Sequence, residues 1–279
     1  MNRSLFAAIA IFALTLSCGG NKTAKGEVET DSDSIATEPE TIDTLEQLIS
    51  ETPMPKAADE LFDDFFFNFA ANRKLQLKRI KFPLAVTSSG GNACSIDRKA
   101  WKTEHFFMHQ DYYTLIFNSR KQMETVKDTN VNHVVVEKIS LEKMSVRQYV
   151  FDRINGLWMM QTIHDTPLTD NPNSSFLHFY RKFAGDSLFQ VQHVSDPVKF
   201  VGPDPDDDFG EMTGVLTPET WPAFAPELPH KTIYNIIYGQ PYRESQRRIF
   251  VLRGIANGLE MELSFKFVHG KWLLTEFNQ

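Results

Sequence analysis

Large aromatic residues recur at helical spacing in two separate stretches of the chain. The first set is Phe62, Phe65, Phe66 and Phe69, and the second is Phe176, Phe179, Tyr180 and Phe183. Spacing of i, i+3, i+4 and i+7 places four side chains on one face, so each stretch predicts an amphipathic helix. Such a stripe requires a broad apolar surface to cover it, and a curved sheet supplies one. We expect a strand after each helix, starting at Leu75–Leu77 and at Phe189–Val191.

Alternating apolar and polar residues predict a hairpin near the end of the chain. From Glu260 to Phe267 the odd positions are apolar and the even ones polar, which is typical of a strand with one buried face. A turn at His269–Gly270 and a strand from Lys271 complete the hairpin. A similar pattern surrounds Asn155–Gly156, and Asn-Gly is a strong hairpin signal because the tight turn requires positive φ.

These patterns belong to an internal repeat. Residues 62–84 align with residues 176–198 at a constant offset of 114, and the same offset returns where Trp158 matches Trp272. Between these segments Trp101 matches Trp221 at an offset of 120, so the middle of the repeat varies in length. A copy of about 110 residues is a normal domain size. We therefore predict two tandem domains, residues 58–168 and 169–279.

The order of helix, strand, variable middle and final hairpin resembles the nuclear-transport-factor-2-like fold. The resemblance implies an α+β protein with two cone-shaped domains, each an N-terminal helix packed in a curved antiparallel sheet. It also implies a pocket at the open end of each cone. The chain is similar to uncharacterised two-domain lipoproteins of Gram-negative bacteria, which have no assigned activity. The resemblance therefore predicts a fold and a cellular address, but no chemistry.

The first eighteen residues resemble a bacterial lipoprotein signal. Arg3 gives the positive start, Leu5–Leu16 is an apolar core too short to span a membrane, and Ser17-Cys18 follows directly. Thr15 stands where such signals prefer Leu, so cleavage nearby without a lipid is the alternative. We expect acylation of Cys18 to attach the chain to the lipid bilayer. The predicted location is the periplasm or the outer membrane of a Gram-negative bacterium.

Residues 19–57 are predicted to form a disordered acidic tether. The chain carries a net charge of −7, of which −6 belongs to this segment and +1 to Arg3, leaving −2 for residues 58–279. The tether contains no aromatic residue, so it buries too little apolar area to offset its ordering entropy. A nearly neutral folded part argues against nucleic acid as a partner.

Four aromatic residues are candidates for lining a ligand pocket: Trp101, Tyr149, Trp221 and Tyr234. They could stack on a sugar or a lipid, and packing in the core is the alternative. A basic cluster around Arg73–Lys81 could contact an anionic ligand, or it could be a solvated strand face.

No metal site and no cofactor is predicted. His105 and His109 share a helical spacing, but the sequence fixes no third ligand, and Phe106 follows the first His where the zincin motif requires Glu. The acidic loop 202–211 has Phe209 where an EF-hand requires Gly. The sequence contains no phosphate loop, nucleophile elbow or Cys/His cluster.

Three functions remain open at this stage. The leading hypothesis is a non-enzymatic, membrane-anchored envelope protein that binds a small ligand or an envelope partner. The first alternative is an enzyme with an acid/base site in one cone pocket, which would require a carboxylate or His at an inward position. The second alternative is a structural envelope protein whose cones leave no open pocket.

Overall fold

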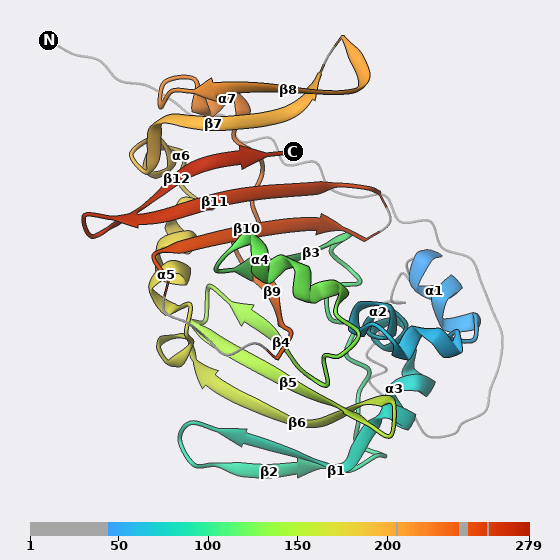
Figure 1. Ribbon diagram of the computed structural model, residues 1–279. Coiled ribbons are helices and arrows are strands. Elements are labelled where there is room, and N and C mark those ends of the chain that lie inside the picture. Colours follow the sequence, from blue (N-terminus) through green and yellow to red (C-terminus); the bar gives the residue numbers. More distant parts are fainter. Residues whose placement is uncertain (1–43, 205, 240–244, 256) are drawn as a thin grey trace, which may run out of the picture. The chain divides into compact units, whose positions relative to one another are not determined.

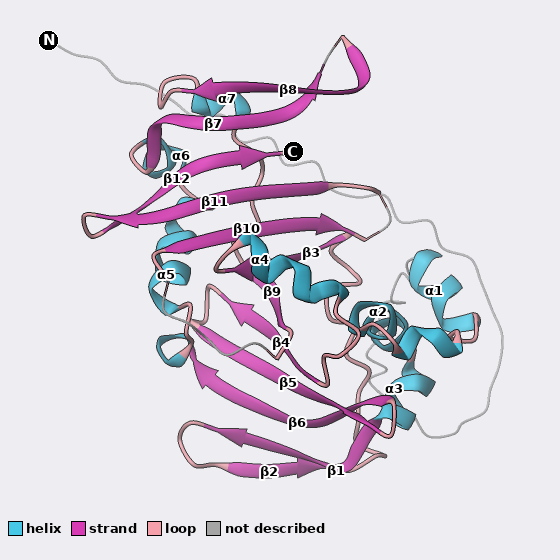
Figure 2. Cartoon of the chain, in the orientation of Figure 1, coloured by secondary structure: helices cyan, strands magenta, loops and turns pink. Residues whose placement is uncertain are grey.

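The computed structural model describes residues 44–204, 206–239, 245–255 and 257–279, and residues 42–279 form one compact unit. The predicted signal peptide, Cys18 and most of the predicted tether lie outside the described residues. The fold combines short helices with two six-stranded sheets (Figures 1 and 2). The α+β class predicted from the sequence is therefore confirmed.

Each copy begins with the predicted aromatic helix, α2 (Phe62–Ala71) in the first copy and α5 (Ser174–Phe183) in the second. The other helical segments are shorter: α1 Thr44–Glu51, α3 Arg73–Arg79, α4 Arg120–Met123, α6 Ser187–Val191, α7 Trp221–Phe224, and the 3-10 turns Lys56–Asp59, Glu124–Lys127 and Leu168–Asp170.

The strands form two sheets of matching order. The first sheet runs in the order β2 (Ala93–Ile96), β1 (Ile80–Ser88), β6 (Leu157–Pro167), β5 (Ser145–Ile154), β4 (His133–Ser140) and β9 (Thr232–Ile237). The second sheet runs in the order β8 (Asp207–Leu216), β7 (Val194–Asp204), β12 (Lys271–Asn278), β11 (Glu260–Val268), β10 (Arg247–Gly254) and β3 (Tyr112–Phe117).

The aromatic stripe of each helix packs on the sheet of its own copy. The rings of Phe69 and Phe151 lie 5.3 Å apart in the first copy. The matched rings of Phe183 and Phe265 lie at the same distance in the second. Both helix residues have no exposed surface. The repeat therefore extends from sequence to core packing, where such ring pairs add to the free energy of area burial.

One expected element is wrong in both copies. Leu75–Leu77 and Phe189–Val191, predicted as strand starts, lie in helices α3 and α6, and the strands begin at Ile80 and Val194. Side-chain caps explain the helices. Asn72 accepts a hydrogen bond from Leu75 N at 3.0 Å, and Asp186 accepts one from Phe189 N at 3.0 Å. Each cap satisfies a backbone donor of the first helical turn.

The predicted C-terminal hairpins are present and antiparallel, as β5–β6 and β11–β12. Their turns have the expected positive φ, 51° at Asn155 and 80° at Gly156, and 48° at His269 and 80° at Gly270. The sheets are not wholly antiparallel, because β1 runs parallel to β6 and β7 runs parallel to β12. A helix and a short connection, α2–α3 or α5–α6, precede each of these parallel strands.

The two copies exchange one strand each. β3 belongs to the first copy by sequence but pairs with β10 of the second, and β9 of the second copy pairs with β4 of the first. In Figure 1, β3 and β9 are the edge strands at which the two sheets meet. The sheets are therefore each completed by the other copy. The domain limits 58–168 and 169–279 remain a prediction drawn from the repeat.

The segment predicted as tether contains structure at its C-terminal end. Helix α1 spans Thr44–Glu51, and Ile49 and Met54 pack against the core of the first copy. The prediction of disorder relied on the absence of aromatic residues and did not take these aliphatic side chains into account. The tether prediction is thus corrected for residues 44–57, and residues 19–43 lie outside the described part of the chain.

Candidate functional site

A cleft of about 850 Å³ opens on the first copy, between strands β4, β5 and β6. We call it the polar cleft. Its lining residues are Glu104, Lys138, Ser140, Glu142, Lys143, Met144, Ser145, Val146, Arg147, Tyr149, Asp165, Thr166, Pro167 and Thr232. Three of these side chains are cationic and three are acidic, so the lining has no net charge. A smaller cavity of about 260 Å³ shares Glu104, Arg147 and Tyr149 with it.

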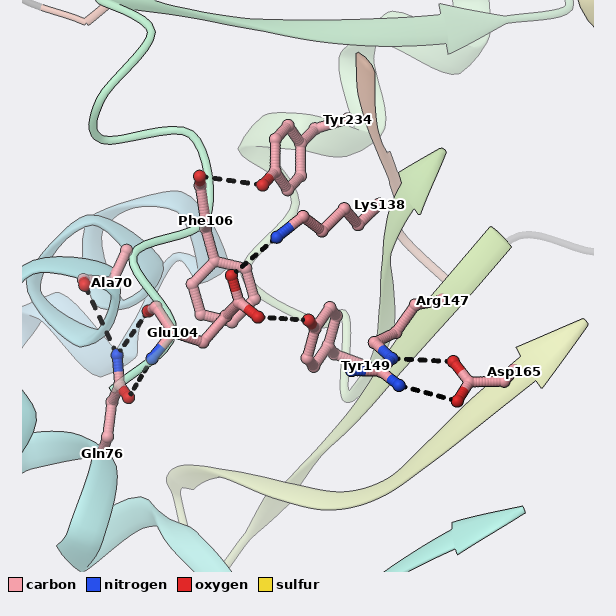
Figure 3. A network of polar contacts seen from close by, with 9 residues as sticks. All are labelled: Ala70, Gln76, Glu104, Phe106, Lys138, Arg147, Tyr149, Asp165 and Tyr234. Carbon is pink, nitrogen blue, oxygen red and sulfur yellow. Dashed lines mark hydrogen bonds and ion pairs between the residues drawn. The ribbon is translucent and has the colours of Figure 1, made fainter. Parts of the chain in front are cut away.

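Glu104 reaches the polar cleft from an irregular segment that Gln76 holds in place. Gln76 Nε2 donates to the Glu104 carbonyl at 2.8 Å, and Glu104 N donates to Gln76 Oε1 at 3.2 Å (Figure 3). The Trp101 indole N–H donates to the same Oε1 at 3.0 Å. Gln76 is fully buried, so its hydrogen bonds fix the backbone of Glu104, which carries the carboxylate.

The Glu104 carboxylate pairs with two donors. Lys138 Nζ lies 2.9 Å from Oε1, and the Tyr149 hydroxyl donates to Oε2 at 2.7 Å (Figure 3). The Glu104 side chain is 22% exposed and that of Lys138 is 37% exposed. Solvent and a ligand can therefore reach both charges, while the Tyr149 ring stays in the core.

The pKa values of Glu104 and Tyr149 are shifted in opposite directions, both away from neutral pH. Burial acts to raise the pKa of Glu104, but the hydrogen bonds from Tyr149 and Lys138 outweigh it, and the pKa lies below the usual value. Burial and the negative charge of Glu104 raise the pKa of Tyr149. At neutral pH Glu104 is thus an ionised acceptor and Tyr149 a protonated donor.

A second ion pair lines the same cleft. Arg147 on β5 and Asp165 on β6 face each other in the strand register, and the guanidinium makes two hydrogen bonds to the carboxylate, at 2.7 and 2.8 Å (Figure 3). The two side chains are 48% and 37% exposed. The cleft therefore presents two accessible charge pairs on either side of Tyr149.

The second copy has apolar residues at the matched positions. At the offset of 114, Lys138, Arg147 and Tyr149 correspond to Leu252, Met261 and Leu263. The glutamine–indole bond is kept, since Trp221 Nε1 donates to Gln190 Oε1 at 3.0 Å. The scaffold is thus repeated, while the charged lining belongs to the first copy.

The structure places the four predicted pocket residues differently. Tyr149 lines the polar cleft, and Trp101 lines the smaller cavity beside it. Tyr234 is buried, and its hydroxyl donates to the Phe106 carbonyl at 2.8 Å (Figure 3). Trp221 is fully buried with its N–H bonded to Gln190, which is the packing alternative.

Glu104, Lys138 and Arg147 were not predicted as site residues from the sequence. Glu104 stands directly before His105, which was considered only as a metal ligand, and none of the three charged residues belongs to a motif. The available signal was the comparison of copies, because inward positions that are apolar in the second copy are charged in the first. Such a difference at matched core-facing positions points to a role other than packing.

The described residues contain no group of three or more His, Cys, Asp or Glu side chains that could hold a metal ion. The His105 and His109 rings are neighbours, with centroids 4.7 Å apart, in a turn rather than a helix. Within the same residues, no helix has the length and apolar character needed to cross a bilayer.

Comparison with known proteins places the chain in a family. A crystal structure of an NTF2-like protein from Bacteroides fragilis NCTC 9343 is similar to it, with 41% sequence identity and a TM-score of 0.73. The similarity covers 81% of this chain and 98% of that one, so the fold is nuclear-transport-factor-2-like. No curated protein matches the chain. Residues 41–279 match the family model described as a domain of unknown function, and the chain therefore belongs to the DUF4348 family.

Proposed function

We propose that this protein is an anchored envelope protein that binds a small zwitterionic ligand in the polar cleft. The observation that carries the proposal is the group formed by Glu104, Lys138 and Tyr149, in which charges of both signs are held at an accessible surface. A lining with equal numbers of acidic and cationic side chains complements a ligand that carries both signs itself.

The contacts suggest how such a ligand binds. Its carboxylate or phosphate would pair with Lys138 and Arg147, and its ammonium group with Glu104 and Asp165. Both resident ion pairs are partly exposed, so a charged ligand can reach and replace them. The Tyr149 hydroxyl keeps its hydrogen bond to Glu104 and so holds that carboxylate in place.

Membrane attachment is the second part of the proposal. It is supported by the apolar run Leu5–Leu16 directly before Ser17-Cys18. Mass spectrometry of the membrane fraction should find an acylated Cys18 at the N-terminus of the mature chain. A mature chain that starts elsewhere and stays in the soluble fraction would refute the anchor and leave the cleft proposal untouched.

An acid/base enzyme is the second candidate, favoured by the 2.7 Å contact between Glu104 and Tyr149. Here a carboxylate lies in the polar cleft within reach of Lys138 and Tyr149, which is the kind of arrangement an enzyme would need. General acid–base catalysis works best with pKa values near the working pH. The pKa of Glu104 is lowered and that of Tyr149 is raised, so binding is the better supported function.

Calorimetry with phosphoethanolamine and with glycine tests the binding proposal, with glycerol as a neutral control. Glu104→Gln and Lys138→Gln should each weaken binding by about tenfold or more, because each removes a charged hydrogen bond. Lys199→Gln is the matched control, since Lys199 is an exposed lysine of the second copy that also pairs with a carboxylate. Equal affinity in all four proteins, or no binding of either zwitterion, would reject the proposal.

A further inference from the structure

A second cleft, of about 590 Å³, opens on the second copy. We call it the apolar cleft. Its apolar lining is formed by Leu228, Leu252, Leu259 and Met261, and Tyr112 and Thr232 also line it. Leu228, Leu252 and Met261 are buried, while Leu259 is 39% exposed. The charged residues Glu227 and Lys231 are exposed.

The repeat makes the two clefts equivalent. Leu252, Leu259 and Met261 match Lys138, Ser145 and Arg147 of the polar cleft at the offset of 114. Tyr112 matches Thr232 at the offset of 120. At these three matched positions the lining is polar or charged in the first copy and apolar in the second.

The clefts also meet. Thr232 lines both of them, because the strand exchange brings the start of β9 beside Ser140 of β4. Leu141 N donates to the Lys231 carbonyl at 2.9 Å, which fixes this shared wall. Thr232 is therefore the boundary that a ligand of the polar cleft would cross to reach Leu252 and Met261.

We propose that the two clefts bind one amphiphilic molecule, with a zwitterionic head in the polar cleft and a single hydrocarbon chain in the apolar cleft. This inference rests on the proposed function, since the head is the ligand class assigned to the polar cleft. Six of the eleven residues that line the apolar cleft are apolar or aromatic, and a concave site of several hundred Å³ that combines such walls with polar groups is typical of a small-molecule site.

The test is calorimetry on the full chain with phosphoethanolamine and with lysophosphatidylethanolamines of four, six and eight acyl carbons, kept below their micelle concentrations. Each buried methylene should tighten binding by about fourfold. Octanoate added separately with phosphoethanolamine should bind more weakly than the joined molecule, because joining makes the second contact intramolecular.

Leu259→Asp should abolish the dependence on chain length without changing the affinity for phosphoethanolamine. Leu259 is partly exposed, so the fold tolerates the change. Leu188→Asp, at a leucine 75% exposed on α6, is the matched control and should bind like the wild type.

Three outcomes overturn the inference in distinguishable ways. Binding of phosphoethanolamine with no gain from the chain rejects the amphiphile and leaves the proposed function standing. Chain-dependent binding without any affinity for phosphoethanolamine or glycine rejects both the amphiphile and the proposed function. A chain dependence that survives Leu259→Asp places the hydrocarbon outside the apolar cleft and also rejects the inference.

Discussion

Thr114 and Tyr234 occupy equivalent positions of the two copies and hydrogen-bond to each other. Tyr234 N donates to Thr114 Oγ1 at 3.1 Å, and the threonine hydroxyl donates to the Tyr234 carbonyl. Because matched residues of the two copies contact each other, the local two-fold axis that relates the copies passes between β3 and β9. Thr114 and Tyr234 are both buried, so the exchanged strands form an interior joint between the sheets.

Asn235, the next residue on β9, should be essential to this joint. Its side chain donates to Glu137 Oε2 at 2.9 Å and accepts from Ile116 N at 2.8 Å. Asn235→Ala leaves a buried carboxylate oxygen and a buried backbone donor without these partners. We expect a loss of about 3 kcal/mol in the free energy of unfolding, measured by urea denaturation.

The same variant should alter the pH dependence of stability. Burial raises the pKa of Glu137, and the hydrogen bonds from Asn235, Gln148 and Asn171 oppose this rise. Removing Asn235 should raise the pKa further, so the gap between variant and wild type should widen as the pH rises through the folded pKa of the wild type, which already lies above 4.5. Asn130→Ala, at an exposed asparagine, is the control and should change stability by less than about 0.5 kcal/mol.

Asp63 should contribute a separate pH dependence. Burial raises its pKa to about 6, although the Tyr238 hydroxyl donates to it at 2.7 Å. A folded pKa above the unfolded value of 3.8 means that the folded state binds more protons. Stability from this group is therefore complete below pH 3.8 and is lost as the pH rises through about 6.

Unfolding measured from pH 3.5 to 7 should accordingly show a fall in stability that Asp63→Asn removes. Carbon-13 titration of the Asp63 carboxyl measures the pKa directly. Asp64→Asn removes a neighbouring negative charge that contributes to the raised pKa of Asp63, so it should keep the fall in stability and move it to slightly lower pH. A carboxyl that titrates near 4 in the folded protein would contradict the expectation.

The matched residues Phe69 and Phe183 should have equal energetic weight. Both are fully buried against a sheet phenylalanine, so replacing either with Ala should cost about 3–5 kcal/mol. Thermal and urea unfolding measure the loss. Leu188→Ala, at a highly exposed leucine, should have little effect. A small cost at only one of the two phenylalanines would show that the copies are packed differently.

The elements whose hydrophobic pattern continues over many residues were predictable from the sequence. The helices through Phe69 and Phe183 and the hairpins at Asn155–Gly156 and His269–Gly270 are formed as expected. The apolar alternation around Gln76 and Gln190 misled. A strand with that alternation would bury the flanking apolar residues and expose the glutamine, whereas the short helices bury the glutamine and leave Leu75 and Leu77 half-buried. The capping residue before each helix was the missed signal.

Strand partners and the site were harder to predict. The pattern of Tyr112–Phe117 specifies a buried strand but not the neighbour it pairs with, and the exchange selects β10. Glu104 belongs to an irregular segment, so no hydrophobic periodicity in the sequence indicated where its side chain lies. Its place in the polar cleft depends on Gln76 and on the strand register of Lys138 and Tyr149, which only the folded chain brings together.

The strand exchange makes a final prediction about the two halves of the chain. Residues 44–168 without the second half lack β9, the partner of β4, and residues 169–279 alone lack β3, the partner of β10. Each half would also expose its own unpaired strand, and unpaired edges promote association. Neither half should therefore behave as a cooperatively folded monomer in size-exclusion chromatography and thermal unfolding.

When the halves are produced together as separate chains, they should form a one-to-one complex, because each supplies the strand that the other sheet lacks. Asn235→Ala in the second half should weaken that complex, since Asn235 bonds to both Glu137 and Ile116 of the first. A half that melts cooperatively as a monomer would mean that it can pair its own β3 or β9 internally, and the exchange would then not be required for folding.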